Sequence, residues 1–147
     1  MDLEVAVKMA RDLMEDYDFA HWSLKLDRAK TRHGQCDYGK QEISLSRYFV
    51  ELNEEWLVRE TILHEIAHAI AGSRAAHGPR WRTVARNLGV RPQACKPSNM
   101  PEAPWRIVCA SGHDLGGRHR RALKLDWHVC GRCRTPLRYV PATAKVS

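Results

Sequence analysis

The sequence has no apolar run that approaches the roughly 18 residues needed for a membrane-spanning helix. Its first residues, Met1 to Glu4, show no basic region followed by an apolar core, so no secretory signal is evident. These two absences lead us to expect a cytoplasmic protein without membrane contact. Its five cysteines are then expected to be metal ligands or free thiols rather than disulfides.

Acidic residues are scarce in the last third of the chain. Residues 105–147 contain nine lysines and arginines but only two acidic residues, Asp114 and Asp126, whereas residues 1–104 contain 15 basic and 15 acidic residues. The net charge of +7 therefore lies entirely in the last 43 residues. This uneven distribution favours two parts with different roles, one of which faces a polyanion.

Helical periodicity predicts three helices in the first 90 residues. The first covers residues 2–16 with Asp2 as its N-cap, and a long second helix begins at Asn53 and stops at Gly72. A third, shorter helix begins at Pro79 and ends at Gly89. The long helix is expected to bury one side, formed by Trp56, Leu57, Thr61, Leu63, Ala67 and Ile70.

Alternation of apolar and polar residues predicts strands over residues 22–29 and 42–46, expected to be antiparallel neighbours. A turn-rich stretch from Gly34 to Gly39 separates them. The predicted fold class is thus α+β, with helices packed on a small antiparallel sheet. The predicted domains are a core domain over 1–90, a proline-rich linker over 91–104, a small β module over 105–140 and a tail over 141–147.

The motif His64-Glu65-Ile66-Ala67-His68 lies inside the predicted long helix. Its i,i+4 spacing places both imidazoles on one face, one turn apart, where two nitrogens can reach one ion. Glu65 lies beside the first histidine, where it can hold and deprotonate a water. The pattern therefore predicts a catalytic zinc site rather than two unrelated helix histidines.

A catalytic zinc takes three protein ligands and keeps one position open. We predict His77 as the third ligand, because the helix break at Gly72 lets the chain turn back toward the metal before the next helix opens at Pro79. A glutamate ligand is disfavoured because residues 66–101 contain no glutamate.

The zinc motif, followed by His77-Gly78-Pro79-Arg80-Trp81, resembles the SprT-like (Spartan-type) zinc metalloprotease domain. Gly34-Gln35-Cys36 and Ile43-Ser44-Leu45-Ser46 resemble a strand segment of that family, and the resemblance extends over roughly residues 5–140. It implies a zincin-type core, DNA-linked proteolysis, Glu65 as the general base and three zinc ligands, His64, His68 and His77.

Cys130-Gly131-Arg132-Cys133 forms a C-x-x-C knuckle, and Cys109 lies about twenty residues upstream. These thiols predict a zinc ribbon whose closed, cysteine-rich site is structural, so that the chain holds two zinc ions. We prefer His113 as the fourth ligand, with His119, His128 or a water as alternatives. SprT-like proteins commonly carry a C-terminal zinc ribbon, which agrees with this position.

Basic residues cluster between the ribbon cysteines, near Trp105 and Tyr139. Phosphate contacts from such residues and base stacking on aromatic rings suit single-stranded DNA. A solvated hairpin with core tryptophans is the alternative, and the family resemblance favours DNA. The predicted DNA-binding residues are Arg118, Arg120, Arg121, Lys124 and Trp127.

The sequence as a whole predicts a zinc-dependent endopeptidase that acts on DNA-bound or DNA-crosslinked proteins, as a cytoplasmic, nucleoid-associated monomer. The choice of substrate comes from the resemblance alone. Two alternatives stay open: a general cytosolic zinc peptidase with a structural ribbon, and a non-catalytic, zinc-stapled DNA-binding module. Glu65 argues against the second alternative, because binding alone needs the ligands but not the base.

Overall fold

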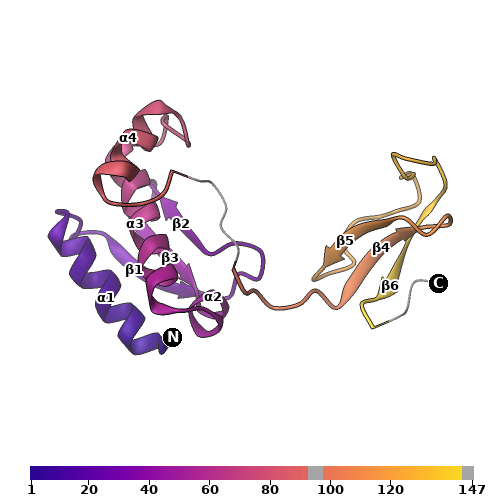
Figure 1. The fold of residues 1–147 in the computed structure, drawn as a ribbon, viewed down its shortest axis with the longest axis horizontal. Helices are drawn as coiled ribbons and strands as arrows, with labels where there is room; N and C mark the ends of the chain where they lie inside the picture. The colour runs from indigo at the N-terminus through magenta and orange to yellow at the C-terminus, as the bar shows by residue number, and fades with distance from the viewer. Residues whose placement is uncertain (93–97, 144–147) are drawn as a thin grey trace. The chain divides into compact units, whose positions relative to one another are not determined.

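The structure is a computed structural model that describes residues 1–92 and 98–143. The chain forms two compact units, Met1–Met100 and Pro101–Ser147 (Figure 1). Part of the predicted linker, residues 93–97, and most of the predicted tail, residues 144–147, lie outside the described residues. The two units are therefore described separately.

The described residues of the first unit form four helices, which are α1 (Leu3–Asp16), α2 (Arg47–Leu52), α3 (Glu55–Ala71) and α4 (Pro79–Asn87). The predicted cap of α1 is confirmed, because the Asp2 side chain accepts hydrogen bonds from the backbone N–H groups of Glu4 and Val5. The prediction of Asn53 as the N-cap of the long helix is wrong. Asn53 ends α2, a helix that the sequence analysis missed, and Glu54 is the N-cap of α3.

Helix α3 is the centre of the first unit and is buried on most of its circumference. Its buried residues include Val58, Ile62 and Ile66, which lie outside the predicted buried side. Trp56 and Ile70, which were predicted to be buried, are exposed. A helix that packs against α1, α4 and the sheet at once has no single apolar stripe, so periodicity could not identify its buried side.

The sheet of the first unit contains β1 (Ser23–Asp27), β2 (Gly34–Asp37) and β3 (Glu42–Ser46) in the order β1-β3-β2. The prediction that the first and last of these strands are antiparallel is wrong, since β1 and β3 are parallel. The predicted turn at Gly34 is instead strand β2, which pairs antiparallel with β3. The hairpin from β2 back to β3 inserts β3 between the other two strands, and β3 is therefore the most buried of the three.

The second unit contains a three-stranded antiparallel sheet formed by β4 (Trp105–Cys109), β5 (Asp114–Arg118) and β6 (Leu137–Pro141) in the order β5-β4-β6. Few of its described residues are both buried and apolar, namely Ile107, Val108, Cys109 and Cys130. The fold class predicted from the sequence, α+β followed by a small β module, is confirmed. Within the described residues, no helix is both long and apolar enough to cross a membrane.

Candidate active site and second metal centre

Three histidine side chains converge in the first unit. His64 and His68 lie one turn apart on α3, and His77 lies in the segment between α3 and α4. The Nε2 atom of His77 is 3.1 Å from Nε2 of His64 and 3.1 Å from Nε2 of His68. The structure thus brings together the three residues that the sequence analysis selected as ligands of one ion.

This donor set fits a zinc ion. Zn–N bonds of about 2.0–2.1 Å in a tetrahedral site place neighbouring nitrogens about 3.3 Å apart, close to the separations in this cluster. The three histidines could therefore bind one metal ion through one nitrogen each. His64 and His68 are partly buried whereas His77 is exposed, so the cluster faces solvent on one side. A metal bound there would keep a position accessible to a substrate.

Trp81 of α4 supports the histidine cluster. Its side chain is fully buried, and its ring centroid lies 4.7 Å from that of His64, 5.2 Å from that of His68 and 4.6 Å from that of His77. One rigid aromatic ring therefore contacts all three imidazoles and restricts their orientations. The sequence analysis noted Trp81 only as part of the family motif and missed this packing role.

Glu65 lies on α3 between the two helix histidines and is 7% exposed. Burial raises the pKa of its carboxyl group to about 7, against the opposing effects of the nearby Arg32 guanidinium and of a hydrogen bond from the Cys36 backbone N–H. Such a carboxyl group can both accept and release a proton near neutral pH.

Strand β2 holds the Glu65 side chain in place. A Cβ atom at Gly34 would lie 3.0 Å from Cγ and 3.1 Å from Oε1 of Glu65, and 3.0 Å from the carbonyl oxygen of Ser44. A side chain at position 34 would force the Glu65 side chain to shift by a few tenths of an ångström. The sequence analysis used Gly34 only as part of a turn-rich stretch and of a family segment, because a close approach between a strand and a helix is not encoded locally.

Tyr38, just after β2, makes a second contact with α3. Its hydroxyl donates a hydrogen bond of 2.9 Å to the backbone carbonyl of His68. Burial raises the pKa of the Tyr38 hydroxyl to about 12 and the pKa of the neighbouring Cys36 thiol to about 12. Both groups therefore stay protonated at neutral pH and act as structural neighbours of the site.

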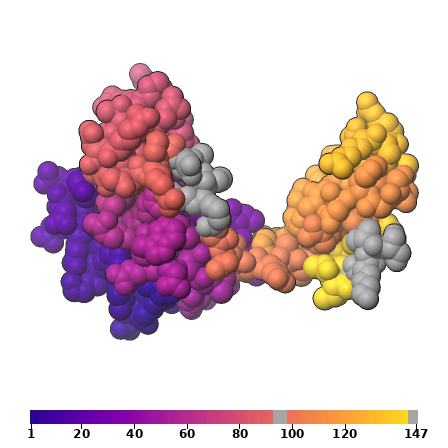
Figure 2. All heavy atoms as spheres, in the orientation of Figure 1, coloured from indigo at the N-terminus to yellow at the C-terminus, as the bar shows by residue number. Residues whose placement is uncertain are grey.

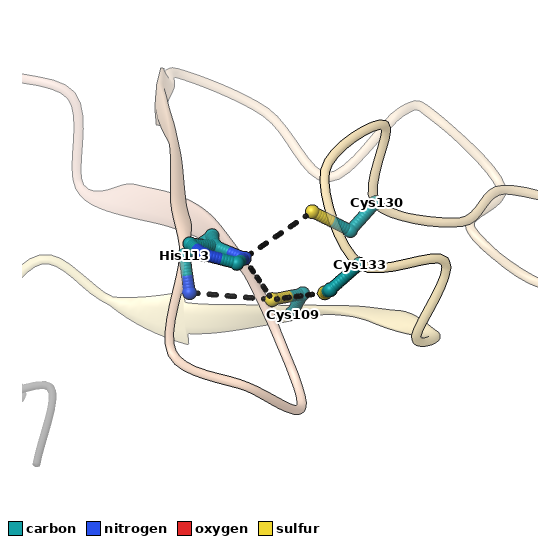
Figure 3. Close-up of side chains that lie close together, drawn as sticks. All are labelled: Cys109, His113, Cys130 and Cys133. Atoms are coloured by element: carbon teal, nitrogen blue, oxygen red, sulfur yellow. Dashed lines mark hydrogen bonds between the residues drawn. The ribbon is translucent and has the colours of Figure 1, made fainter.

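Four side chains converge in the second unit: Cys109, His113, Cys130 and Cys133 (Figure 3). The Nδ1 atom of His113 is 3.5 Å from the sulfur of Cys109 and 3.6 Å from the sulfur of Cys130. The sulfurs of Cys109 and Cys133 are 3.6 Å apart. The structure brings His113 to the thiols, and neither of the two alternative histidines belongs to the cluster in the described residues.

These separations also fit one tetrahedral zinc ion. Zn–S bonds of about 2.3 Å place neighbouring sulfurs about 3.7 Å apart. Hydrogen bonds from the Thr135 hydroxyl and backbone lower the pKa of the Cys133 thiol to about 5, which favours the thiolate that a metal requires. The four residues could bind one metal ion, and they leave no tetrahedral position open.

The predicted DNA-binding residues of the second unit are all exposed, and Trp127 is 91% exposed. Trp127 is therefore not a core residue. The Arg121 guanidinium lies 4.4 Å from the centroid of the Trp105 ring, and Arg118 donates a hydrogen bond to the carbonyl of Gly117. Two hydrogen bonds between the Tyr139 hydroxyl and the backbone of Leu123 fix the start of the loop that carries Trp127.

The fold and the histidine cluster define an α+β protein with a possible metal centre built on an H-E-x-x-H helix. The SprT-like family model matches residues 4–100, which is most of the first unit and more than half of the chain. The chain belongs to the SprT-like family.

Similar curated proteins bear SprT names. The chain is 28% identical to "Protein SprT-like" from Geobacillus kaustophilus, over 82% of this chain and 85% of that protein. It is 27% identical to "Protein SprT-like" from Bacillus subtilis, over 95% and 99% of the two chains. It is 31% identical to "Protein SprT" from Pseudomonas savastanoi, where the match covers 58% of this chain and 60% of that protein. No solved structure gave a significant match.

Proposed function

We propose that this protein is a zinc-dependent endopeptidase that acts on DNA-bound or DNA-crosslinked proteins. The observation that carries the proposal is the placement of a buried carboxyl group, Glu65, on the same helix as two of three convergent histidines. A purely structural metal site needs the ligands but has no use for a buried acid beside them. Membership in the SprT-like family supports the same activity.

Peptide hydrolysis requires activation of a water and of the scissile carbonyl. His64, His68 and His77 would hold a zinc ion, which would supply the Lewis acidity that polarises a carbonyl oxygen and makes water more acidic. Glu65 accepts the proton of the attacking water and donates it to the nitrogen of the leaving amine. Gly34 and the Cys36 N–H hold the Glu65 carboxylate in position for these two transfers.

The DNA-linked part of the proposal concerns the second unit. Its cysteine–histidine cluster holds a structural zinc ion, and its exposed basic residues bind phosphates while Trp127 stacks on a base. The exposure of Trp127 supports this role, because a ring with no packing role in its own unit is available to a ligand. We propose that the protein acts on such substrates in the cytoplasm, at the nucleoid, as a monomer.

The test combines metal analysis with a cleavage assay. We expect two zinc ions per chain, and cleavage of casein or histones that single-stranded DNA stimulates. The variant E65Q keeps both metals and loses at least about a hundredfold in cleavage rate, since general acid–base catalysis contributes about 10²–10⁴-fold. Cleavage by E65Q within about tenfold of the unmodified protein would refute the role of Glu65.

The same assay distinguishes the alternative functions. Cleavage that DNA does not change would favour a general zinc peptidase with a structural ribbon. DNA binding without any cleavage, together with two bound metals, would favour the non-catalytic binding module.

A further inference from the structure

The first unit contains a basic region that its balanced total charge conceals. Residues 1–65 contain 14 acidic and nine basic residues, whereas residues 66–92 contain five arginines and no acidic residue. The first unit is therefore divided into an acidic part and a basic part. The basic part comprises the end of α3, the His77 segment and α4.

The arginines of α4 are Arg80, Arg82 and Arg86, and all three are exposed. Within the described residues, none of them forms an ion pair with a carboxylate. Arg91 differs, because it forms hydrogen bonds to both carboxylate oxygens of Glu60. The three α4 guanidinium groups are therefore free to bind an external anion, and we refer to them as the α4 basic surface.

The packing of α4 explains why these arginines face outward. Trp81 and Ala85, one turn apart, are fully buried against the rest of the unit. The outer positions of the helix are occupied by the arginines, Thr83 and Asn87, all of them polar and exposed. Helix α4 lies at the surface of the first unit (Figure 2). The helix that carries the α4 basic surface packs on the histidine cluster, because α4 begins two residues after His77 and its Trp81 contacts all three imidazoles.

We infer that the α4 basic surface is a second nucleic-acid contact, which binds the phosphate backbone of DNA independently of the second unit. A membrane surface is a poor partner, because α4 exposes no large apolar side chain that could insert between lipids. A long polyanion is a good partner, since the second unit also carries an excess of basic residues and favours the same class of ligand. This contact would hold DNA beside the histidine cluster, where a protein attached to that DNA must be cut.

The inference extends the DNA-binding part of the proposed function to the first unit, but it requires neither peptidase activity nor binding by the ribbon. From the balanced charge of residues 1–104, the sequence predicted DNA binding by the ribbon alone. The balance arises because two opposite regions cancel in the sum.

The test is an anisotropy titration of labelled oligothymidylate with the full chain at several salt concentrations. The variant R80Q/R82Q/R86Q removes three cations from exposed helix positions. If each binds a phosphate, the slope of log affinity against log salt becomes shallower by about 2, at about 0.7 per contact on single strands. The matched control is R11Q/K25Q/R28Q, which removes three exposed cations elsewhere in the first unit and should leave the slope unchanged.

Equal slopes and affinities for the α4 variant and the unmodified protein would overturn the inference. It would also be overturned if the α4 variant lost its binding of polyglutamate of matched charge but kept its full affinity for DNA, because the surface would then bind acidic polypeptides and not DNA. The variant R118E/R120E/R121E tests the ribbon separately. A loss of DNA affinity in R118E/R120E/R121E alone supports DNA binding by the ribbon, as the proposed function has it, and refutes this inference. A loss of DNA affinity in the α4 variant alone supports this inference and refutes DNA binding by the ribbon. Zinc content and far-UV circular dichroism serve as the folding controls.

Discussion

The two candidate metal centres differ in what surrounds them. The histidine cluster lies in a unit whose described residues include 18 that are buried and apolar, and it leaves one side open to solvent. The cysteine–histidine cluster lies in a unit with four buried apolar residues among those described, two of which are themselves ligand candidates. We therefore expect the first unit to fold without a metal and to use a bound metal for chemistry, and we expect the second unit to need a metal in order to fold.

The largest difference in folding between the two units is expected when one candidate metal ligand is removed from each cluster. C130S should unfold the second unit, because a structural zinc contributes about 10–16 kcal/mol of apparent binding free energy to such small modules. H68A should remove only the metal of the first unit and leave both units folded. Amide NMR spectra of the full chain, with zinc analysis, measure both outcomes. A second unit that stays folded in C130S without its metal would contradict the comparison.

A chelator should remove zinc from the two centres at different rates. The histidine site is open and has no thiolate, so its zinc and the cleavage activity should be lost first and recovered when zinc is restored. The cysteine-rich site should hold its zinc longer, and its loss should unfold residues 101–143. The measurement is zinc release with a colorimetric chelator, followed in parallel with activity. Loss of both ions at the same rate would show that the two sites bind zinc with similar kinetic stability.

The two tryptophans Trp81 and Trp127 offer a third test. W81A should lower the free energy of unfolding of the first unit by about 3–5 kcal/mol, because it removes a fully buried ring. W127A should change stability by less than about 0.5 kcal/mol, because the ring is 91% exposed. It should weaken single-stranded DNA binding by about 1–3 kcal/mol through lost stacking. Urea unfolding and DNA titration separate the two effects, and full DNA affinity in W127A would exclude stacking on that ring.

The smallest structural change concerns the glycine beside Glu65. G34A should keep the metal but lower kcat by less than about a hundredfold, because the new methyl group shifts the Glu65 carboxylate by a few tenths of an ångström and a misplacement of about 1 Å costs about a hundredfold. G39A is the matched control, since its Cβ would meet only Asp37 Oδ1 at an ordinary 3.5 Å. Equal kcat values for G34A and the unmodified protein, with metal content unchanged, would show that Gly34 does not position Glu65.

Sequence reasoning succeeded where the signal is local. The spacing of His64 and His68, the C-x-x-C knuckle and the Asp2 cap each depend on residues within one or two turns of each other. It failed for strand β2 and for the parallel pairing of β1 with β3, because these depend on which distant segment a strand meets. It also missed the contact between Gly34 and Glu65, where residues 31 positions apart touch.

The hydrogen bonds of Asn53 bear on where a recombinant fragment of the first unit should end. The Asn53 side-chain amide is 7% exposed; it donates to the carbonyls of Phe49 and Asn99, and its oxygen accepts from the Asn99 N–H. A recombinant fragment that stops at residue 90 would lose the Asn99 partners and leave buried polar atoms unsatisfied, at about 1–3 kcal/mol each. A fragment extended to residue 100 keeps them, so we expect expression of the isolated first unit to succeed with the longer boundary.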